Sequence, residues 1–294
     1  MEREIMFAQV LNARGGATLR FEPVRGGVIS WNTYAPSGTL RFRVLRAGAP
    51  ASAWYDYAQW QPSGRKSFSP QSDRDGIAVD VDVLGAEQPF DGIELAGEEI
   101  DFTLLAFAAP QRPEPSLPYA RDAMILDVPA RTQYVREDER GWCSAASLSM
   151  VNAYHGIDRP VEETAMAVMD RAYNGTGNWA FNTAFSGSLG LRAVVAYLQN
   201  LDQAARLIER NVPVVISYSW RAGELPGAPL PHSDGHLVVL RGFSENGDCA
   251  INDPAAHGVR AVYPRRAIEA IWQRNNGLAY VIAPAGIDYE SVLV

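Results

Sequence analysis

The sequence predicts an α+β protein in two parts: an antiparallel β-sandwich or jelly-roll in residues 1–109 and an α+β domain in residues 123–294. Two observations predict this division. Apolar and polar residues alternate in the first hundred residues, whereas the second half mixes helical spacing with apolar strand-like runs. A proline-rich segment, residues 110–122, lies between them and disfavours both helix and central strand, so we expect it to be a linker.

Three runs in the first part have the period-two pattern of half-buried strands: residues 38–48, 76–85 and 98–107. The middle run, for example, places four apolar residues on one face: Ile77, Val79, Val81 and Val83. Five aromatic residues, Trp31, Trp54, Tyr55, Tyr57 and Trp60, suit the core of such a sandwich better than a binding face. We nevertheless expect this part to be an accessory module that binds a partner or the substrate.

The second part predicts helices at residues 142–156, 160–173, 201–211 and 265–275. Gly156 suits the left-handed end of the first helix. Strands are predicted at residues 212–220, 235–243, 248–253 and 278–284, and Asn246-Gly247 predicts a hairpin between the middle two. The intervening residues 177–187 are rich in Gly and Asn, which indicates a loop.

The overall charge limits the kinds of partner. The formal net charge is −8 and no basic patch is present, so we expect neither a nucleic-acid nor a membrane partner. No apolar run reaches the length of a membrane span, and the N-terminal residues lack a signal-peptide pattern. Together with only two cysteines, Cys143 and Cys249, this predicts a reduced, cytoplasmic protein, while secretion by another route stays open.

Cys143 stands at the predicted start of a helix, where free N–H groups and the positive end of the helix dipole lower the pKa of a thiol. A buried structural thiol is the alternative interpretation. A catalytic thiol also needs an imidazole and a group that orients it. His236 opens the strand at residues 235–243, and the predicted hairpin brings it to the same end as Asp253. The three residues could therefore form one site.

Residues 128–156, which include Gln133 and Cys143, resemble the start of the Peptidase_C39-type cysteine peptidases. The order Gln133, Cys143, His236 and Asp253 is similar to the order of functional residues in that family, and the resemblance extends over about residues 125–285. It implies a papain-like fold for the second domain and hydrolysis of a peptide or amide bond in a peptide or protein substrate, with no cofactor and no metal. By the same resemblance, Gln133 would donate to the oxyanion, Cys143 would attack, His236 would carry the proton and Asp253 would orient His236.

The sequence departs from the family beside the nucleophile, where Ser144 replaces the usual glycine and Trp142 precedes it. We therefore expect Trp142 and Ser144 to influence substrate choice. In the predicted loop, Asn178, Trp179 and Asn182 are expected to line the cleft, although Trp179 also suits a packed anchor.

Two other functions remain open from the sequence. One is a non-catalytic peptide-binding protein on the same fold. The other is a metal-dependent hydrolase that uses His232, His236 and Asp253, a set whose spacing outside a helix is weak support for a metal site.

Overall fold

The structure, a computed structural model, describes residues 6–62, 64–72, 75–118, 122–136 and 141–294. It has a mixed α/β architecture with two antiparallel sheets, as the sequence predicts, and it divides into two compact units. The first unit comprises residues 1–110, 167–195 and 294, and the second comprises residues 111–166 and 196–293. Residues 167–195, which the sequence assigns to the second domain, group with the first unit. Part of the predicted linker, residues 119–121, lies outside the described residues.

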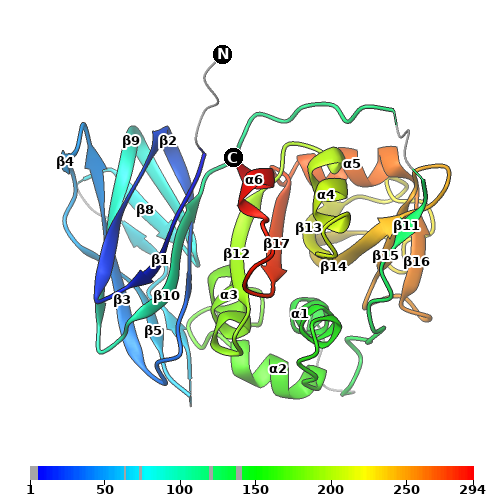
Figure 1. Ribbon diagram of the computed structural model, residues 1–294, viewed down its shortest axis with the longest axis horizontal. Helices are drawn as coiled ribbons and strands as arrows, with labels where there is room; N and C mark the ends of the chain where they lie inside the picture. The colour runs from blue at the N-terminus through cyan, green and yellow to red at the C-terminus, as the bar shows by residue number, and fades with distance from the viewer. Residues whose placement is uncertain (1–5, 63, 73–74, 119–121, 137–140) are drawn as a thin grey trace. The chain divides into compact units, whose positions relative to one another are not determined.

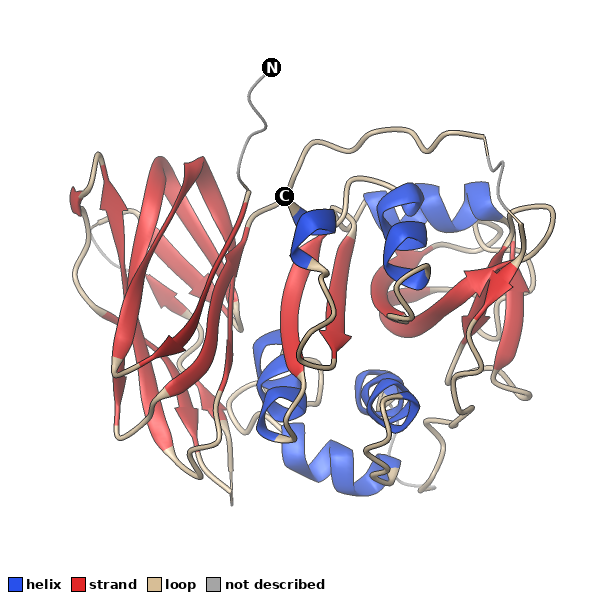
Figure 2. Ribbon diagram, in the orientation of Figure 1, coloured by secondary structure: helices blue, strands red, loops and turns tan. Residues whose placement is uncertain are grey.

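The strands of the first unit form one continuous hydrogen-bonded sheet in the order β1-β10-β2-β9-β3-β5-β6, with β4 paired to β3 and the β7–β8 hairpin attached to β9. Their bounds are β1 (Phe7–Ala13), β2 (Gly16–Asn32), β3 (Gly38–Arg46), β4 (Ala49–Pro50), β5 (Tyr55–Trp60), β6 (Lys66–Ser67), β7 (Gln71–Ser72), β8 (Ile77–Asp80), β9 (Val83–Glu98) and β10 (Phe102–Ala108). In Figure 2, the described residues up to 110 are drawn as strands and loops only. The predicted two-layer sandwich stays a prediction.

The predicted strand at residues 76–85 is wrong as a single strand, because it is a tight hairpin. β8 pairs with the first residues of β9, with Asp80 opposite Val83. Val81 adopts a φ of +55°, and its N–H donates to Ser69 Oγ. The left-handed backbone at Val81 reverses the chain, so the four apolar residues do not share one face: Ile77 and Val79 are buried, whereas Val83 is 36% exposed. The turn residue Asp82 is thereby buried.

The core of the first unit holds the aromatic residues that the sequence favours as core. Trp31, Tyr55, Tyr57 and Trp60 are all buried. Trp31 packs edge-on against the rings of Tyr57 and Trp60, with ring centroids 6.1 and 6.3 Å apart. These four side chains are therefore part of the packing and do not form an exposed aromatic face.

The segment at residues 167–195 is attached to the strands of the first unit by buried hydrogen bonds. Asn32 Nδ2 donates to the carbonyl oxygen of Ala193 at 2.8 Å, and Asn32 Oδ1 accepts from the N–H of Ala193 at 2.9 Å. Ser30 Oγ also accepts from the N–H of Val195. These bonds give the buried backbone groups of Ala193 and Val195 partners, and leaving such groups unpaired would destabilise the fold.

Residues 179–188 form a helix, α3 (Trp179–Ser188), so the predicted loop at residues 177–187 is wrong. Asn178 is the N-cap, because its side chain accepts from the N–H of Phe181 at 3.0 Å. The carboxylate of Asp82 accepts from the next two amides, those of Trp179 and Ala180. The Gly- and Asn-rich composition indicates a loop, but one of these Asn residues, Asn178, is the N-cap of the helix.

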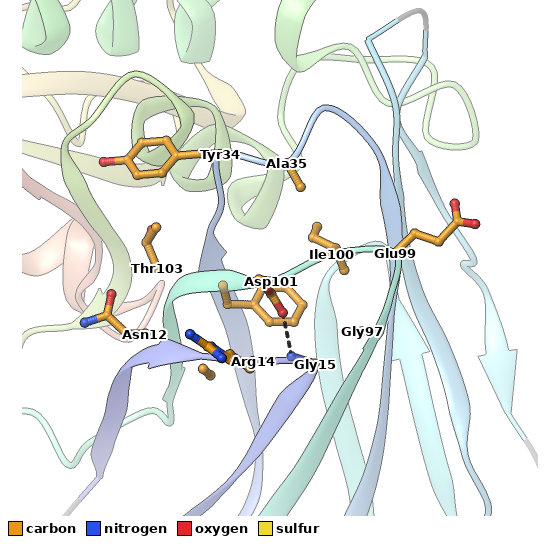
Figure 3. A pocket seen from close by; sticks show the side chains of 12 residues that line it. Asn12, Arg14, Gly15, Tyr34, Ala35, Gly97, Glu99, Ile100, Asp101 and Thr103 are labelled. Carbon is orange, nitrogen blue, oxygen red and sulfur yellow. Dashed lines mark hydrogen bonds between the residues drawn. The ribbon is translucent and has the colours of Figure 1, made fainter.

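Figure 3 shows a pocket of about 630 Å³ on the first unit, between the β1–β2 turn and the β9–β10 turn. Across it, the N–H of Gly15 donates to Asp101 Oδ1 at 2.9 Å and joins the two turns. The ring of Tyr34 stands at the pocket, two-thirds exposed.

The second sheet has the order β12-β17-β13-β14-β15-β16, with β11 on β14 (Figure 1), and the first four residues of β12, 192–195, group with the first unit. Its strands are β11 (Met124–Ile125), β12 (Arg192–Tyr197), β13 (Val214–Trp220), β14 (Ser233–Phe243), β15 (Cys249–Asn252), β16 (Arg260–Tyr263) and β17 (Leu278–Ala283). The remaining helices are α1 (Cys143–Tyr154), α2 (Val161–Val168), α4 (Leu201–Ile208), α5 (Arg265–Gln273) and α6 (Glu290–Leu293). Helix α1 packs on β13 and β14, and α4 and α5 pack on β13. None of the helices within the described residues has the length and apolar character to span a bilayer.

Two glycines of the second unit adopt backbone conformations that other residues rarely adopt. Gly156 follows α1 with a φ of +85°, the left-handed conformation that the sequence predicts. Gly242 lies at the bulge of β14 with a φ of +155°, and a Cβ there would lie 2.0 Å from the carbonyl oxygen of Met124. Only glycine therefore lets β11 pair with β14 and start the segment that leads to Gln133.

Candidate active site

Cys143 is the first residue of helix α1, as the sequence predicts. Trp142 stands at the N-cap position without a side-chain hydrogen bond to the first turn, so the thiol lies beside backbone N–H groups. The small side chains after Cys143 allow α1 to approach β14 closely, and Ser147 Oγ donates to the carbonyl oxygen of Leu237 at 3.1 Å. This bond joins the helix of Cys143 to the residue that follows His236.

His236 and Asp253 lie together at one end of the β14–β15 hairpin. The strands pair antiparallel through the turn at Asn246-Gly247, and Asp253 follows the last residue of β15. His236 Nε2 lies 2.8 Å from Asp253 Oδ1, with 3% and 0% of the two side chains exposed. The predicted hairpin therefore brings the imidazole and the carboxylate into contact.

The carboxylate of Asp253 has further donors. Its Oδ1 accepts from the N–H of Ala255 at 2.9 Å, and its Oδ2 accepts from the phenol of Tyr263 at 2.8 Å. Burial raises the pKa of Asp253, but the hydrogen bond and charge of His236 and the donors Tyr263 and Ala255 outweigh burial and lower the pKa below its usual value. Asp253 is therefore an anion at neutral pH.

The thiol of Cys143 lies close enough to the His236 ring for each group to alter the pKa of the other. Burial raises the pKa of Cys143, yet the hydrogen bond and charge of His236, with N–H groups of Leu237 and Ser144, lower it overall. Burial lowers the pKa of His236, but Asp253 and Cys143 raise it overall. Both shifts favour a thiolate paired with an imidazolium, which is the reactive form of a cysteine nucleophile.

Two aromatic side chains of β13 enclose the imidazole, and the sequence analysis does not assign either of them to the site. The ring of Trp220 lies 5.6 Å from that of His236, and the ring of Tyr218 lies 6.2 Å from it, both edge-on. Tyr218 is the cross-strand partner of His236 in the β13–β14 pair. Alternation along residues 214–220, combined with this register, would have found both. The rings exclude water from the His236–Asp253 pair.

Gln133 is buried and is linked to the same corner of the unit. Its backbone N–H donates to the carbonyl oxygen of Pro254, the residue after Asp253, at 3.0 Å. Asn252 fixes the chain just before Gln133, because its Nδ2 donates to the carbonyl oxygens of Val128 and Pro129 at 3.1 and 3.2 Å. Gln133 Oε1 has no hydrogen-bond partner within the described residues.

The residues predicted to bind substrate have different surroundings. Trp142 and Ser144 flank Cys143 but are 3% and 1% exposed. Asn178 and Asn182 belong to the first unit, and their amide nitrogens donate to Asp170 Oδ2 and to the carbonyl oxygen of Thr176. Trp179, also in the first unit, is half-buried. The roles of these five residues in substrate binding stay predictions.

The structure contradicts the alternative of a metal site on His232, His236 and Asp253. His236 and Asp253 bind each other, and His232 is exposed. Across the described ranges, no three His, Cys, Asp or Glu side chains gather in a way that could hold a metal ion.

Among the known structures that match, three each cover about half of this chain. The first, described as a C39-like peptidase from Bacillus anthracis, is 19% identical, with a TM-score of 0.43, and the match covers 55% of this chain and 98% of that one. The second is a double glycine motif protease from an AMS/PCAT transporter, in complex with the leader peptide. It is 20% identical, with a TM-score of 0.38, and the match covers 56% of this chain and 100% of that one. The third is the peptidase domain of Streptococcus ComA, a bi-functional ABC transporter, at 16% identity and a TM-score of 0.37, covering 53% and 97%.

No curated protein matches the chain. The model of the Peptidase_C39 like family, however, matches residues 125–280, a range that contains Gln133, Cys143, His236 and Asp253. This range is more than half of the 294 residues. The chain therefore belongs to the Peptidase_C39 like family.

Proposed function

We propose that the protein is a cysteine peptidase or amidase in which Cys143 is the nucleophile, His236 the proton carrier, Asp253 its orienting partner and Gln133 a donor to the oxyanion. The observation that carries the proposal is the buried His236–Asp253 pair, whose imidazole also lowers the pKa of the Cys143 thiol. His236 uses Nε2 for Asp253, which leaves Nδ1 for the thiol. Family membership supports a peptide or protein as substrate.

Acylation begins from the thiolate–imidazolium pair. The thiolate attacks the carbonyl carbon and forms a C–S bond, and the carbonyl electron pair moves to the oxygen. The N–H of Cys143 and the side-chain amide of Gln133 stabilise that oxyanion. The imidazolium of His236 gives its proton to the leaving nitrogen as the C–N bond breaks, and a thioester remains on Cys143.

Deacylation uses the same groups in reverse. Neutral His236 accepts a proton from water as the water oxygen attacks the thioester carbon. The C–S bond then breaks, which releases a carboxylic acid and restores the thiolate beside an imidazolium. Asp253 stays ionised throughout and keeps the imidazole in one orientation, because its charge and its Oδ1 face Nε2.

Alkylation with iodoacetamide tests the thiolate. We expect the rate at Cys143 to stay high between pH 5 and 8, where a free cysteine is mostly protonated, and to fall in the His236→Ala variant. Cys249 is an internal control, because it is buried in β15 and burial raises its pKa. Peptide mapping assigns each alkylation event. A rate at Cys143 no higher than that of free cysteine contradicts the proposal.

Turnover of p-nitrophenyl acetate separates a hydrolase from a peptide-binding protein on the same fold. A hydrolase releases many equivalents of p-nitrophenol per protein, whereas a protein that is acylated but does not turn over releases one equivalent. The Cys143→Ala variant controls for hydrolysis elsewhere on the surface. A single equivalent would favour the binding protein.

A further inference from the structure

The carboxylate of Asp253 interacts with titratable groups on three strands. These groups are His236 on β14, Tyr263 on β16 and Tyr218 on β13, and Tyr218 in turn lies within the influence of Cys143 and Cys249. Apart from His236, only Tyr263 gives the carboxylate a side-chain hydrogen bond within the described residues. Tyr218 Oη is buried and has no hydrogen-bond partner there.

The two oxygens of Asp253 have separate partners. Oδ1 faces His236 and the N–H of Ala255, and Oδ2 accepts only from the phenol of Tyr263. Tyr263 ends β16, and the pairing of Tyr263 with Cys249 in β15 fixes its position. Its side chain is 1% exposed, so water cannot easily replace it as a donor.

Tyr263 remains a donor over the whole working range of pH. Burial raises its pKa, and the charge of Asp253 and the hydrogen bond to it raise the pKa further. The phenol therefore keeps its proton, and Oδ2 always faces a hydrogen-bond donor.

We propose that Tyr263 is a positioning residue that extends the Cys143–His236–Asp253 chain to four members, holding the carboxylate so that Oδ1 stays directed at His236 Nε2. The inference rests on the proposed function, because it gives Tyr263 a role in forming the reactive thiolate. The sequence analysis does not single out Tyr263, ten residues after Asp253.

Removal of the phenol hydroxyl of Tyr263 should change the pKa of Asp253 in one direction. Without Tyr263, Oδ2 is buried without a donor, which disfavours the charged carboxylate and raises the pKa of Asp253. The carboxylate can then rotate or take up a proton, and either change weakens its support of the imidazolium. A less stable imidazolium raises the pKa of the Cys143 thiol, so the thiolate forms at higher pH.

The test measures the pH profile of Cys143 alkylation by iodoacetamide in the full chain. We expect Tyr263→Phe to move the midpoint up by about one pH unit, which lowers the rate about tenfold on the acidic side. Tyr57→Phe is the matched control, because it removes another buried, hydrogen-bonded phenol hydroxyl, one that bonds to the carbonyl oxygens of Ile29 and Asp82. We expect the midpoint of that variant to match the wild type. Circular dichroism and thermal unfolding verify that both variants fold.

A double-mutant comparison distinguishes positioning from general packing. In an Asp253→Ala background, Tyr263→Phe should change the profile no further, because Tyr263 acts through Asp253. An unchanged midpoint in Tyr263→Phe, an equal shift in Tyr57→Phe, or an additive effect in the Asp253→Ala background overturns this inference while leaving the proposed function intact. A wild-type Cys143 that reacts like free cysteine overturns both.

Discussion

His236 Nε2 and Asp253 Oδ1 lie 2.8 Å apart although seventeen residues separate them in the chain. The β14–β15 hairpin produces this contact, and the bulge between Leu240 and Gly242 sets its register. The same imidazole alters the pKa of the Cys143 thiol, so His236 interacts with both groups. Two predictions test this arrangement, and two test the packing of the first unit.

The charge of Asp253 should control the reactivity of Cys143. Asp253→Asn keeps the shape of the side chain but removes the charge that stabilises the imidazolium, so the pKa of the thiol should rise. We expect alkylation at pH 6 to slow at least about tenfold. Asp234→Asn is the matched control, because Asp234 is exposed and only two residues from His236 in the chain. Equal slowing in both variants would argue against a specific role for Asp253.

Cys143 should in turn raise the pKa of His236. Asp253 and Cys143 both raise that pKa against the opposing effect of burial, so Cys143→Ala should lower it. The imidazole resonances of His236, followed by NMR against pH, measure the change. Cys249→Ala removes the other thiol, which is buried and makes no bond to His236, and should leave the titration as it is. A titration of His236 that is the same in Cys143→Ala and wild type would break the thiolate–imidazolium model.

Asp82 should make the stability of the first unit depend on pH. Burial raises the pKa of Asp82 to about 7, against the lowering by the N–H groups of Ala180 and Trp179, and the nearby Asp170 raises it further. The folded state therefore keeps a proton that the unfolded chain loses above about pH 4. The free energy of unfolding should fall between about pH 4 and pH 7, and this part of the fall should be absent in Asp82→Asn.

We expect the free energy of unfolding of Asp82→Asn, relative to that of the wild type, to increase by on the order of 3 kcal/mol between pH 4 and pH 7.5. Amide hydrogen exchange in β2 and β9 at each pH measures it. The difference between variant and wild type cancels contributions from other groups. A difference that does not change with pH would show that Asp82 is ionised throughout.

Asn32 should be necessary for holding residues 167–195 in the first unit. Asn32→Leu preserves the volume but leaves both the N–H and the carbonyl of Ala193 without their buried partner. We expect a loss of about 3 kcal/mol in the free energy of unfolding, measured by urea denaturation. Ser30→Ala removes only the acceptor of Val195 N–H and should cost about 1 kcal/mol. Costs of equal size would contradict the special role of Asn32.

The sequence by itself was enough to predict the helix start at Cys143, the turn at Asn246-Gly247 and the neighbourhood of His236 and Asp253. All three follow from short-range patterns: helix-start position, turn chemistry and strand register. The aromatic core of the first unit could likewise be predicted from composition and alternation. Local chemistry is read directly from neighbouring residues, so these features needed no knowledge of distant contacts.

The remaining features of the fold and the site could be determined only from the tertiary structure. The turn at Val81 and the helix at residues 179–188 depend on partners far away in the chain, such as the capping of α3 by Asp82, 97 residues before Trp179. The contact of Tyr263 with Asp253 arises because β16 pairs with β15, and the enclosure of His236 by Trp220 arises from the β13–β14 register. Pairing between strands brings together side chains that no local pattern connects. Cys143 could therefore be proposed as a nucleophile from the sequence, whereas the groups that contact His236 and Asp253 emerged only from the fold.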